Sequence, residues 1–172
     1  MAARSFPLGA ALLMSACAGP AVRPPRNVEP YRLTVTVTGY CPCRKCCNWR
    51  RKLWGRPIVA SGPARGRPKR VGITSSGTRA HRGTIAADLG VFPYGTVMYV
   101  PGYGYGRVED TGRSLKGRHI DLFFPRHAQA LRWGRRRVRV LVWPVRQPGA
   151  WPGPGETLLH RMRISTGGNC TP

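Results

Sequence analysis

The sequence predicts an all-β fold, and three observations lead to this class. Several short segments alternate apolar and polar residues with the period of two that is typical of a half-buried strand, as in Leu33, Val35 and Val37. The chain contains 22 Gly and 17 Pro, which favour turns over long helices. Its 172 residues, 41% of them hydrophobic, suffice for one domain with a core and for tails.

The beginning of the chain resembles an export signal. Residues 1–16 place Arg4 before a short apolar run that ends in small residues, as in a secretory signal peptide. Cys17 resembles the cysteine of a lipobox, so we expect it to be acylated and residues 17–30 to be a tether. Because Ala18 follows the cysteine, analogy with other lipoproteins favours a periplasm-facing place in the outer membrane. The alternatives are an ordinary signal peptide and a wrongly assigned start site.

The predicted elements form one domain over residues 31–144. Strands are expected at 32–38, 84–87, 97–100, 120–124 and 137–143, with a further strand ending at 110. A short helix opens at Pro125 and ends at Gly134, the usual order of these two residues around a helix. The segment between Gly62 and Val71 is expected to be a flexible basic loop, and residues 145–172 a Pro/Gly-rich tail. Six short strands with Gly/Pro-rich loops favour a β-barrel.

The cysteines near the end of the first strand allow two interpretations. Cys41, Cys43, Cys46 and Cys47 lie within seven residues. A structural zinc site usually draws Cys and His pairs from two separated segments, and the histidines of this chain show no ligand spacing. An exported protein meets an oxidising compartment, where disulfides form. We therefore expect two disulfides within the cluster, with the pairing open, and no metal.

The net charge of the chain indicates only a broad class of binding partners. There are 29 Lys and Arg against 6 Asp and Glu, a formal net charge of +23. Such a chain is drawn to polyanions, and nucleic acid, anionic lipid headgroups and acidic wall polymers all qualify. Charge alone does not choose among them.

One carboxyl in an apolar strand is the main candidate for chemistry. Asp121 lies between Ile120 and Leu122, and desolvation by apolar neighbours raises the pKa of a carboxyl above its usual ~3.9. Such a group can hold a proton near neutral pH and donate it as a general acid. Asp110 ends the preceding strand at a turn, so the two carboxyls could share one cleft.

These aspartates lie in sequence boxes that resemble a known family. The boxes are GTIAAD at 83–88, PYGT at 93–96, VPGYG at 100–104, EDTG at 109–112 and IDLFF at 120–124. Together they resemble the 3D domain, which is named for three aspartates and is similar to the catalytic barrel of membrane-bound lytic transglycosylase A. The resemblance covers roughly residues 31–144. Arg113, Ser114 and Leu115 replace the Gly-Ala-Ile that is common in the family, which alters the shape and charge of the substrate groove.

The resemblance implies a fold, an activity and a set of site residues. The fold would be a six-stranded double-psi β-barrel with one short helix. The activity would be that of a peptidoglycan lytic transglycosylase in cell-wall turnover, which cleaves the MurNAc–GlcNAc bond and leaves a 1,6-anhydro product. Asp121 matches the catalytic position and Asp110 its neighbour in the cleft. The substrate-binding residues would be Asp88, Tyr103, Thr111, Gly112 and Lys116. No metal or organic cofactor is implied.

Two other functions remain open from the sequence. A non-catalytic peptidoglycan-binding module is favoured by Arg113, because a fixed cation beside Asp121 would lower the pKa of the acid. A zinc-dependent nucleic-acid binder would rest on the charge and the cysteine cluster, but no interleaved aromatic and basic surface can be assigned. We therefore expect glycan strands as the partner, a membrane through the lipid anchor, and no nucleic acid.

Overall fold

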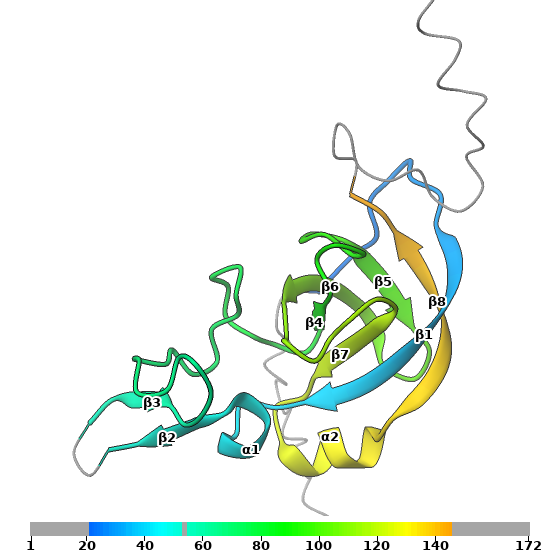
Figure 1. Ribbon diagram of the computed structural model, residues 1–172. Coiled ribbons are helices and arrows are strands. Elements are labelled where there is room, and N and C mark those ends of the chain that lie inside the picture. Colours follow the sequence, from blue (N-terminus) through cyan, green and yellow to red (C-terminus); the bar gives the residue numbers. More distant parts are fainter. Residues whose placement is uncertain (1–20, 53–54, 146–172) are drawn as a thin grey trace, which may run out of the picture.

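The alternating segments of the sequence close into a barrel in the computed structural model, which describes residues 21–52 and 55–145 (Figure 1). The strands are β1 (Tyr31–Tyr40), β4 (Thr84–Ala87), β5 (Val97–Val100), β6 (Gly104–Asp110), β7 (His119–Phe123) and β8 (Arg136–Trp143). They follow the order β1-β7-β4-β6-β5-β8 around the barrel. The predicted all-β class and its six barrel strands are thereby confirmed. The expected signal peptide, Cys17 and the tail from residue 146 lie outside the described residues.

The barrel mixes parallel and antiparallel pairs, and this order fixes the neighbours of β7. Strand β7 lies between β1, to which it is parallel, and β4, to which it is antiparallel. In this register Asp121 has Thr38 on one side and Ala86 on the other. The pair β4 and β6 is also parallel, whereas β5 and β8 join their neighbours antiparallel.

The barrel interior is filled by aliphatic side chains, and a helix closes one end. The fully buried residues include Val35, Val37, Ile85, Met98, Val100, Ile120, Leu122, Val140 and Val142. The helix α2 (His127–Trp133) adds Ala130 and Trp133 to this core. It approaches β1 closely at Gly39, where an added Cβ would lie only 3.2 Å from the Cα of Ala130. No helix among the described residues combines the length and apolarity needed to cross a membrane.

A second, smaller apolar cluster lies on the outside of the barrel. Its buried members are Tyr40, Ala86, Leu115 and Phe123, and we refer to them as the outer cluster. Successive side chains of a strand point to opposite faces, so β7 sends Ile120 and Leu122 inward and Asp121 and Phe123 outward. The predicted catalytic carboxyl therefore shares its face with the outer cluster.

Residues 41–80 form an arm that projects from the side of the barrel (Figure 1), and its residues Cys46, Cys47 and Ala80 pack against the outer cluster. The arm contains α1 (Arg44–Cys47) and a small sheet of β2 (Trp49–Arg51) and β3 (Pro57–Val59). The expectation of a flexible loop after Gly62 differs from the structure, because backbone hydrogen bonds tie this segment to β3. Among them are Val59 N to Arg67 O at 2.9 Å and Lys69 N to Pro57 O at 2.8 Å. Strands of three residues are too short to show a period in the sequence.

The close approach of β4 and β6 can be tested at Gly106. A Cβ at this position would lie 2.7 Å from the Ile85 side chain and 2.8 Å from the carbonyl oxygen of Gly83. Gly106→Ala should therefore destabilise the fold by about 1–3 kcal/mol in urea unfolding, as overpacking does. Gly90→Ala is the control, since its Cβ would lie 3.5 Å from the Asp88 carboxylate, an ordinary contact. Equal stability of the two variants would contradict the tight β4–β6 packing.

Candidate active site

A groove of about 790 Å³ runs between the outer face of the barrel and the arm. Its lining comes from the end of β1, from the arm, from strands β4, β6 and β7, and from the loop that follows β6. Asp110 and Asp121 both line it, as the sequence predicts for two carboxyls in one cleft. Thr111 and Gly112, predicted as substrate-binding residues, line it as well.

Asp121 is a half-buried acid with an elevated pKa. Burial by the outer cluster and its surroundings raises the pKa of Asp121 to about 6, and the charge of Asp110 adds to this rise. The hydroxyl of Thr38, on the neighbouring strand, lowers the pKa and offsets part of the shift. The buried Oδ1 of Asp121 has no hydrogen-bond partner in the described part of the chain. The direction of the pKa shift predicted from the sequence is confirmed.

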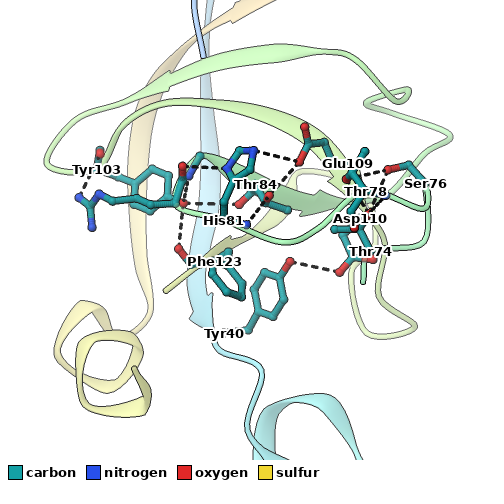
Figure 2. Close-up of polar contacts among 12 residues, drawn as sticks. Tyr40, Thr74, Ser76, Thr78, His81, Thr84, Tyr103, Glu109, Asp110 and Phe123 are labelled. Atoms are coloured by element: carbon teal, nitrogen blue, oxygen red, sulfur yellow. Dashed lines mark hydrogen bonds and ion pairs between the residues drawn. The ribbon is translucent and has the colours of Figure 1, made fainter. Parts of the chain in front are cut away.

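Asp110, by contrast, is held by four donors, of which Figure 2 shows the Tyr40 hydroxyl. Its Oδ1 accepts from the backbone N–H of Ser75 at 2.9 Å, the Ser75 hydroxyl at 2.8 Å and the N–H of Thr111 at 2.9 Å. Its Oδ2 accepts from the Tyr40 hydroxyl at 3.1 Å. A further hydroxyl, that of Tyr94, donates to Ser75 at 2.8 Å. This network fixes the Asp110 carboxylate between the barrel and the arm.

A β-bulge turns Asp110 toward the groove. In the pairing of β4 with β6, Ile85 faces Val108 and Ala86 faces Asp110, so Glu109 is an extra residue. Without the bulge, Asp110 would share the inward face of Val108, two residues earlier. The displaced Glu109 is buried and accepts from the Thr84 hydroxyl at 2.8 Å. The bulge thus gives the groove its second carboxylate.

The two carboxylates flank one small side chain. Ala86 is the register partner of Asp110 on one side and of Asp121 on the other. Neighbouring strands lie about 4.8 Å apart, so the Cα atoms of the two aspartates lie roughly 10 Å apart. An acid with a pKa of about 6, which holds its proton in mildly acidic solution, thereby faces the same groove as a fixed second carboxylate. Two carboxyls in such different environments suit acid–base chemistry on a neutral substrate.

Two other predicted binding residues lie outside the groove lining. The Asp88 carboxylate accepts from the N–H of Gly90 at 3.1 Å and from that of Gly117 at 2.8 Å. These hydrogen bonds lower the pKa of Asp88 and tie the far end of the loop at 111–118, whose other end lines the groove. Lys116 is exposed on that loop and does not line the groove.

Tyr103, another predicted substrate-binding residue, does not line the groove either. Its side chain is buried, and its hydroxyl accepts from the N–H of Gly83 and donates to the carbonyl of Phe123, both at 2.9 Å (Figure 2). The left-handed Gly104 (φ +102°) interrupts the strand alternation directly after Tyr103. The exposed aromatics of this hairpin are Tyr99 and Tyr105 instead, and their ring centroids lie 5.1 Å apart.

Arg113 lies at the arm side of the groove. One of its guanidinium nitrogens lies 3.3 Å from where a Cβ on Gly62 would be. The sequence had raised the possibility that this cation lowers the pKa of Asp121. The pKa of Asp121 is raised all the same, because burial outweighs the influences that lower it.

The clustered cysteines differ from the expectation of two disulfides. Cys41, Cys43, Cys46 and Cys47 are all free in the structure. The sulfurs of the first three lie around Nδ1 of His127, the first residue of α2. His127 could not be predicted as a partner of the cysteines from the sequence, because 81 residues separate it from Cys46. These four groups are the one set among the described residues that could hold a metal ion.

The raised pKa of Asp121 predicts a pH-dependent effect of Asp121→Asn on stability. The pKa of Asp121 is higher in the folded state than in the unfolded state. Its contribution to the free energy of unfolding is therefore largest below pH ~4 and is lost as the pH rises through about 6. Asn does not ionise, so the variant should gain up to about 3 kcal/mol over the wild type at pH 7. Near pH 4 the two should unfold alike in urea.

Asp88→Asn is the matched control for this measurement. The hydrogen bonds to the Asp88 carboxylate lower its pKa. The contribution of Asp88 to the free energy of unfolding is therefore present at neutral pH and lost in acid. Asp88→Asn should therefore be less stable than the wild type at pH 7 and approach it in acid, the opposite trend. A gain for Asp121→Asn that is the same at every pH would contradict the raised pKa.

Part of the chain is similar to known proteins. Residues 83–144 match the family model described as the 3D domain. The chain is 45% identical over 58 residues to the "Putative cell wall shaping protein YabE" of Bacillus subtilis (strain 168), covering 34% of this chain and 14% of that protein. It is 39% identical over 75 residues to the "Cell wall-binding protein YocH" of the same organism, covering 41% of this chain and 26% of that protein. The chain thus spans about a quarter or less of these relatives.

Solved structures of MltA from E. coli also resemble the chain. The first, the crystal structure of MltA, has 22% sequence identity and a TM-score of 0.35, covering 41% of this chain and 26% of that one. The second, MltA with bound chitohexaose, has 18% identity and a TM-score of 0.37, covering 51% of this chain and 29% of that one.

Proposed function

Because residues 83–144 belong to the 3D domain family, we propose that the protein acts on peptidoglycan and cleaves the MurNAc–GlcNAc bond of its glycan strand. The observation that carries the proposal is Asp121, a half-buried acid with a pKa of about 6 on the lining of a large groove. The names of the two relatives, one for wall shaping and one for wall binding, support the substrate class.

Asp121 acts first as the general acid in the proposed reaction. It gives its proton to the glycosidic oxygen, and the bond from that oxygen to C1 of MurNAc breaks. The GlcNAc part leaves with a hydroxyl, and Asp121 is left as a carboxylate. The Asp121 carboxyl lines the groove, so a glycan strand bound there can present its glycosidic oxygen to it.

Asp121 then acts as the base. Its carboxylate removes the proton of the C6 hydroxyl of MurNAc while that oxygen bonds to C1, which closes a 1,6-anhydro ring. The carboxyl ends protonated as it began, and no water is consumed. One carboxyl in both roles departs from the usual scheme in which two carboxyls share the work.

Asp110 is proposed as a positioning residue with an electrostatic effect. Its negative charge raises the pKa of Asp121 and also favours the positive charge that develops at C1 as the bond breaks. The donors from Ser75, Thr111 and Tyr40 hold its carboxylate in place, so little reorganisation is needed during the reaction.

The finer barrel class is part of the same proposal. We assign a double-psi β-barrel, which the family resemblance implies. The two parallel pairs, β1 with β7 and β4 with β6, within a closed six-stranded barrel support this assignment.

The proposed activity is tested by incubating the full-length protein with murein sacculi between pH 4.5 and 7.5 and measuring the masses of the released products by mass spectrometry. The wild type should release anhydro products, each lighter by one water than the hydrolysed ones. Asp121→Asn should lose at least ~10²-fold in rate, because the acid and base is removed. Asp110→Asn should lose less of the rate. As the pH rises, the rate of this variant should fall at a lower pH than that of the wild type, because the pKa of Asp121 drops without the neighbouring charge.

Asp88→Asn serves as the control in this experiment, since Asp88 lies outside the groove lining and should leave most of the activity. Circular dichroism checks that every variant is folded. Full activity of Asp121→Asn would refute the site assignment. Binding of sacculi by the wild type without any cleavage would instead establish a peptidoglycan-binding module, the function that the name of the second relative favours.

We also propose that the protein is an envelope lipoprotein, anchored to the outer membrane through Cys17. The support is the lipobox-like sequence before Cys17 and the place of the proposed substrate. The full-length protein should then partition with membranes, and Cys17→Ser should release it or block its maturation. A wild-type protein recovered in the soluble cytoplasmic fraction would contradict the anchor.

A further inference from the structure

Three cysteines and one histidine converge at the base of the arm. The Sγ atoms of Cys41, Cys43 and Cys46 each lie 3.5 Å from Nδ1 of His127. The sulfurs of Cys41 and Cys46 are 3.6 Å apart, and all four atoms lie within 4.8 Å of one another. Cys41 is buried and the other three residues are half-buried, so the cluster is sheltered from solvent.

Neither disulfides nor hydrogen bonds account for this arrangement. A disulfide requires sulfurs about 2.05 Å apart, far less than the 3.6 Å between Cys41 and Cys46. A ring nitrogen of His127 carries either one proton or one lone pair, so it can serve one thiol and not three. The convergence of three sulfurs on one nitrogen therefore needs another explanation.

The distances fit four ligands of one tetrahedral metal ion. Zinc bonds to thiolate sulfur at about 2.3 Å and to imidazole nitrogen at about 2.0 Å, which places tetrahedral ligand atoms about 3.5–3.8 Å from one another. The distances of 3.5 and 3.6 Å in the cluster agree with this geometry. We propose that Cys41, Cys43, Cys46 and His127 bind a Zn²⁺ ion.

The surroundings of the cluster support bound thiolates. Cys43 precedes α1, and its sulfur accepts from the backbone N–H of Cys46 at 3.4 Å, a hydrogen bond of the kind that orients a metal ligand. Zinc with three thiolates carries a net charge of −1, and the exposed cations Arg44, Lys45 and Arg126 adjoin the ligands in the chain. In a protein with a net charge of +23, such a site is electrostatically favourable.

The packing of α2 on β1 brings His127 close to the cysteines. At Gly39 the chain has no side chain, so α2 packs directly onto β1 near Ala130. Gly39 lies two residues before Cys41, and Ala130 lies one helical turn after His127. The same contact therefore brings the first residue of α2 to the cysteines, and Figure 1 shows α1 close to the beginning of α2.

The role of the proposed zinc is structural. Four protein ligands complete its coordination and leave no open position for a substrate. The ion would link the root of the arm to the helix that closes the barrel. The segment that it fixes also carries Tyr40, a donor to Asp110, and Cys47, which lines the groove. The zinc proposal rests on the ligand geometry and does not depend on the proposed function.

The fourth cysteine of the cluster provides a matched control. The Cys47 sulfur donates to the carbonyl of Cys41 at 3.2 Å and is not among the four converging groups. Cys46→Ser should weaken zinc binding at least about 10-fold, whereas Cys47→Ser should retain one zinc per chain. Elemental analysis of the full-length protein gives the stoichiometry, and competition with a chelator gives the affinity.

X-ray absorption of the zinc-loaded wild type tests the ligand set without relying on the folding of any variant. We expect three sulfurs at about 2.3 Å and one nitrogen at about 2.0 Å. Four sulfur ligands would overturn the proposal, because Cys47 would then replace His127. A zinc-free protein that gains about four mass units on reduction would also overturn it, since the cluster would then hold two disulfides.

Discussion

Burial of one carboxyl against four apolar side chains is the constraint on which the site depends. Tyr40, Ala86, Leu115 and Phe123 lie on the outside of the barrel, where a small β-protein would ordinarily meet water. They are largely buried, although they line the groove, because Cys46, Cys47 and Ala80 of the arm pack against them. Asp121 lies on the same face, so its carboxyl loses solvent as they do and holds its proton to a higher pH.

The position of the second carboxylate, that of Asp110, depends on a β-bulge. The barrel register would turn Asp110 inward, and a single extra residue in β6 turns it out. The arm then supplies Ser75, whose two donors hold the carboxylate. The arm therefore contributes on both sides of the site: it packs against the outer cluster and adds hydrogen bonds to Asp110. The two environments differ for this reason, although Ala86 is the register partner of both residues.

Much of the barrel could be predicted from the sequence, because its strands alternate. The alternation around Asp121 also predicts the outward direction of its carboxyl and the sign of its pKa shift. The bulge at Glu109 could not be predicted, since a strand with an added residue looks locally like any other. Nor could the burial of Tyr103, which depends on the conformation of Gly104. His127 has no local signal as a partner of the cysteines, because only the docking of α2 brings it there.

The order of the strands in the chain has a consequence for how the protein is made. Strand β1 is the first of the barrel to be synthesised, and its two neighbours, β7 and β8, are the last. Tyr31 pairs with Val142, so the sheet closes only after almost the whole described chain exists. Until then Val35 and Val37 have no partners on either side. Contacts so distant in sequence form slowly. A nascent chain of this kind therefore cannot complete its barrel until β7 and β8 have been synthesised.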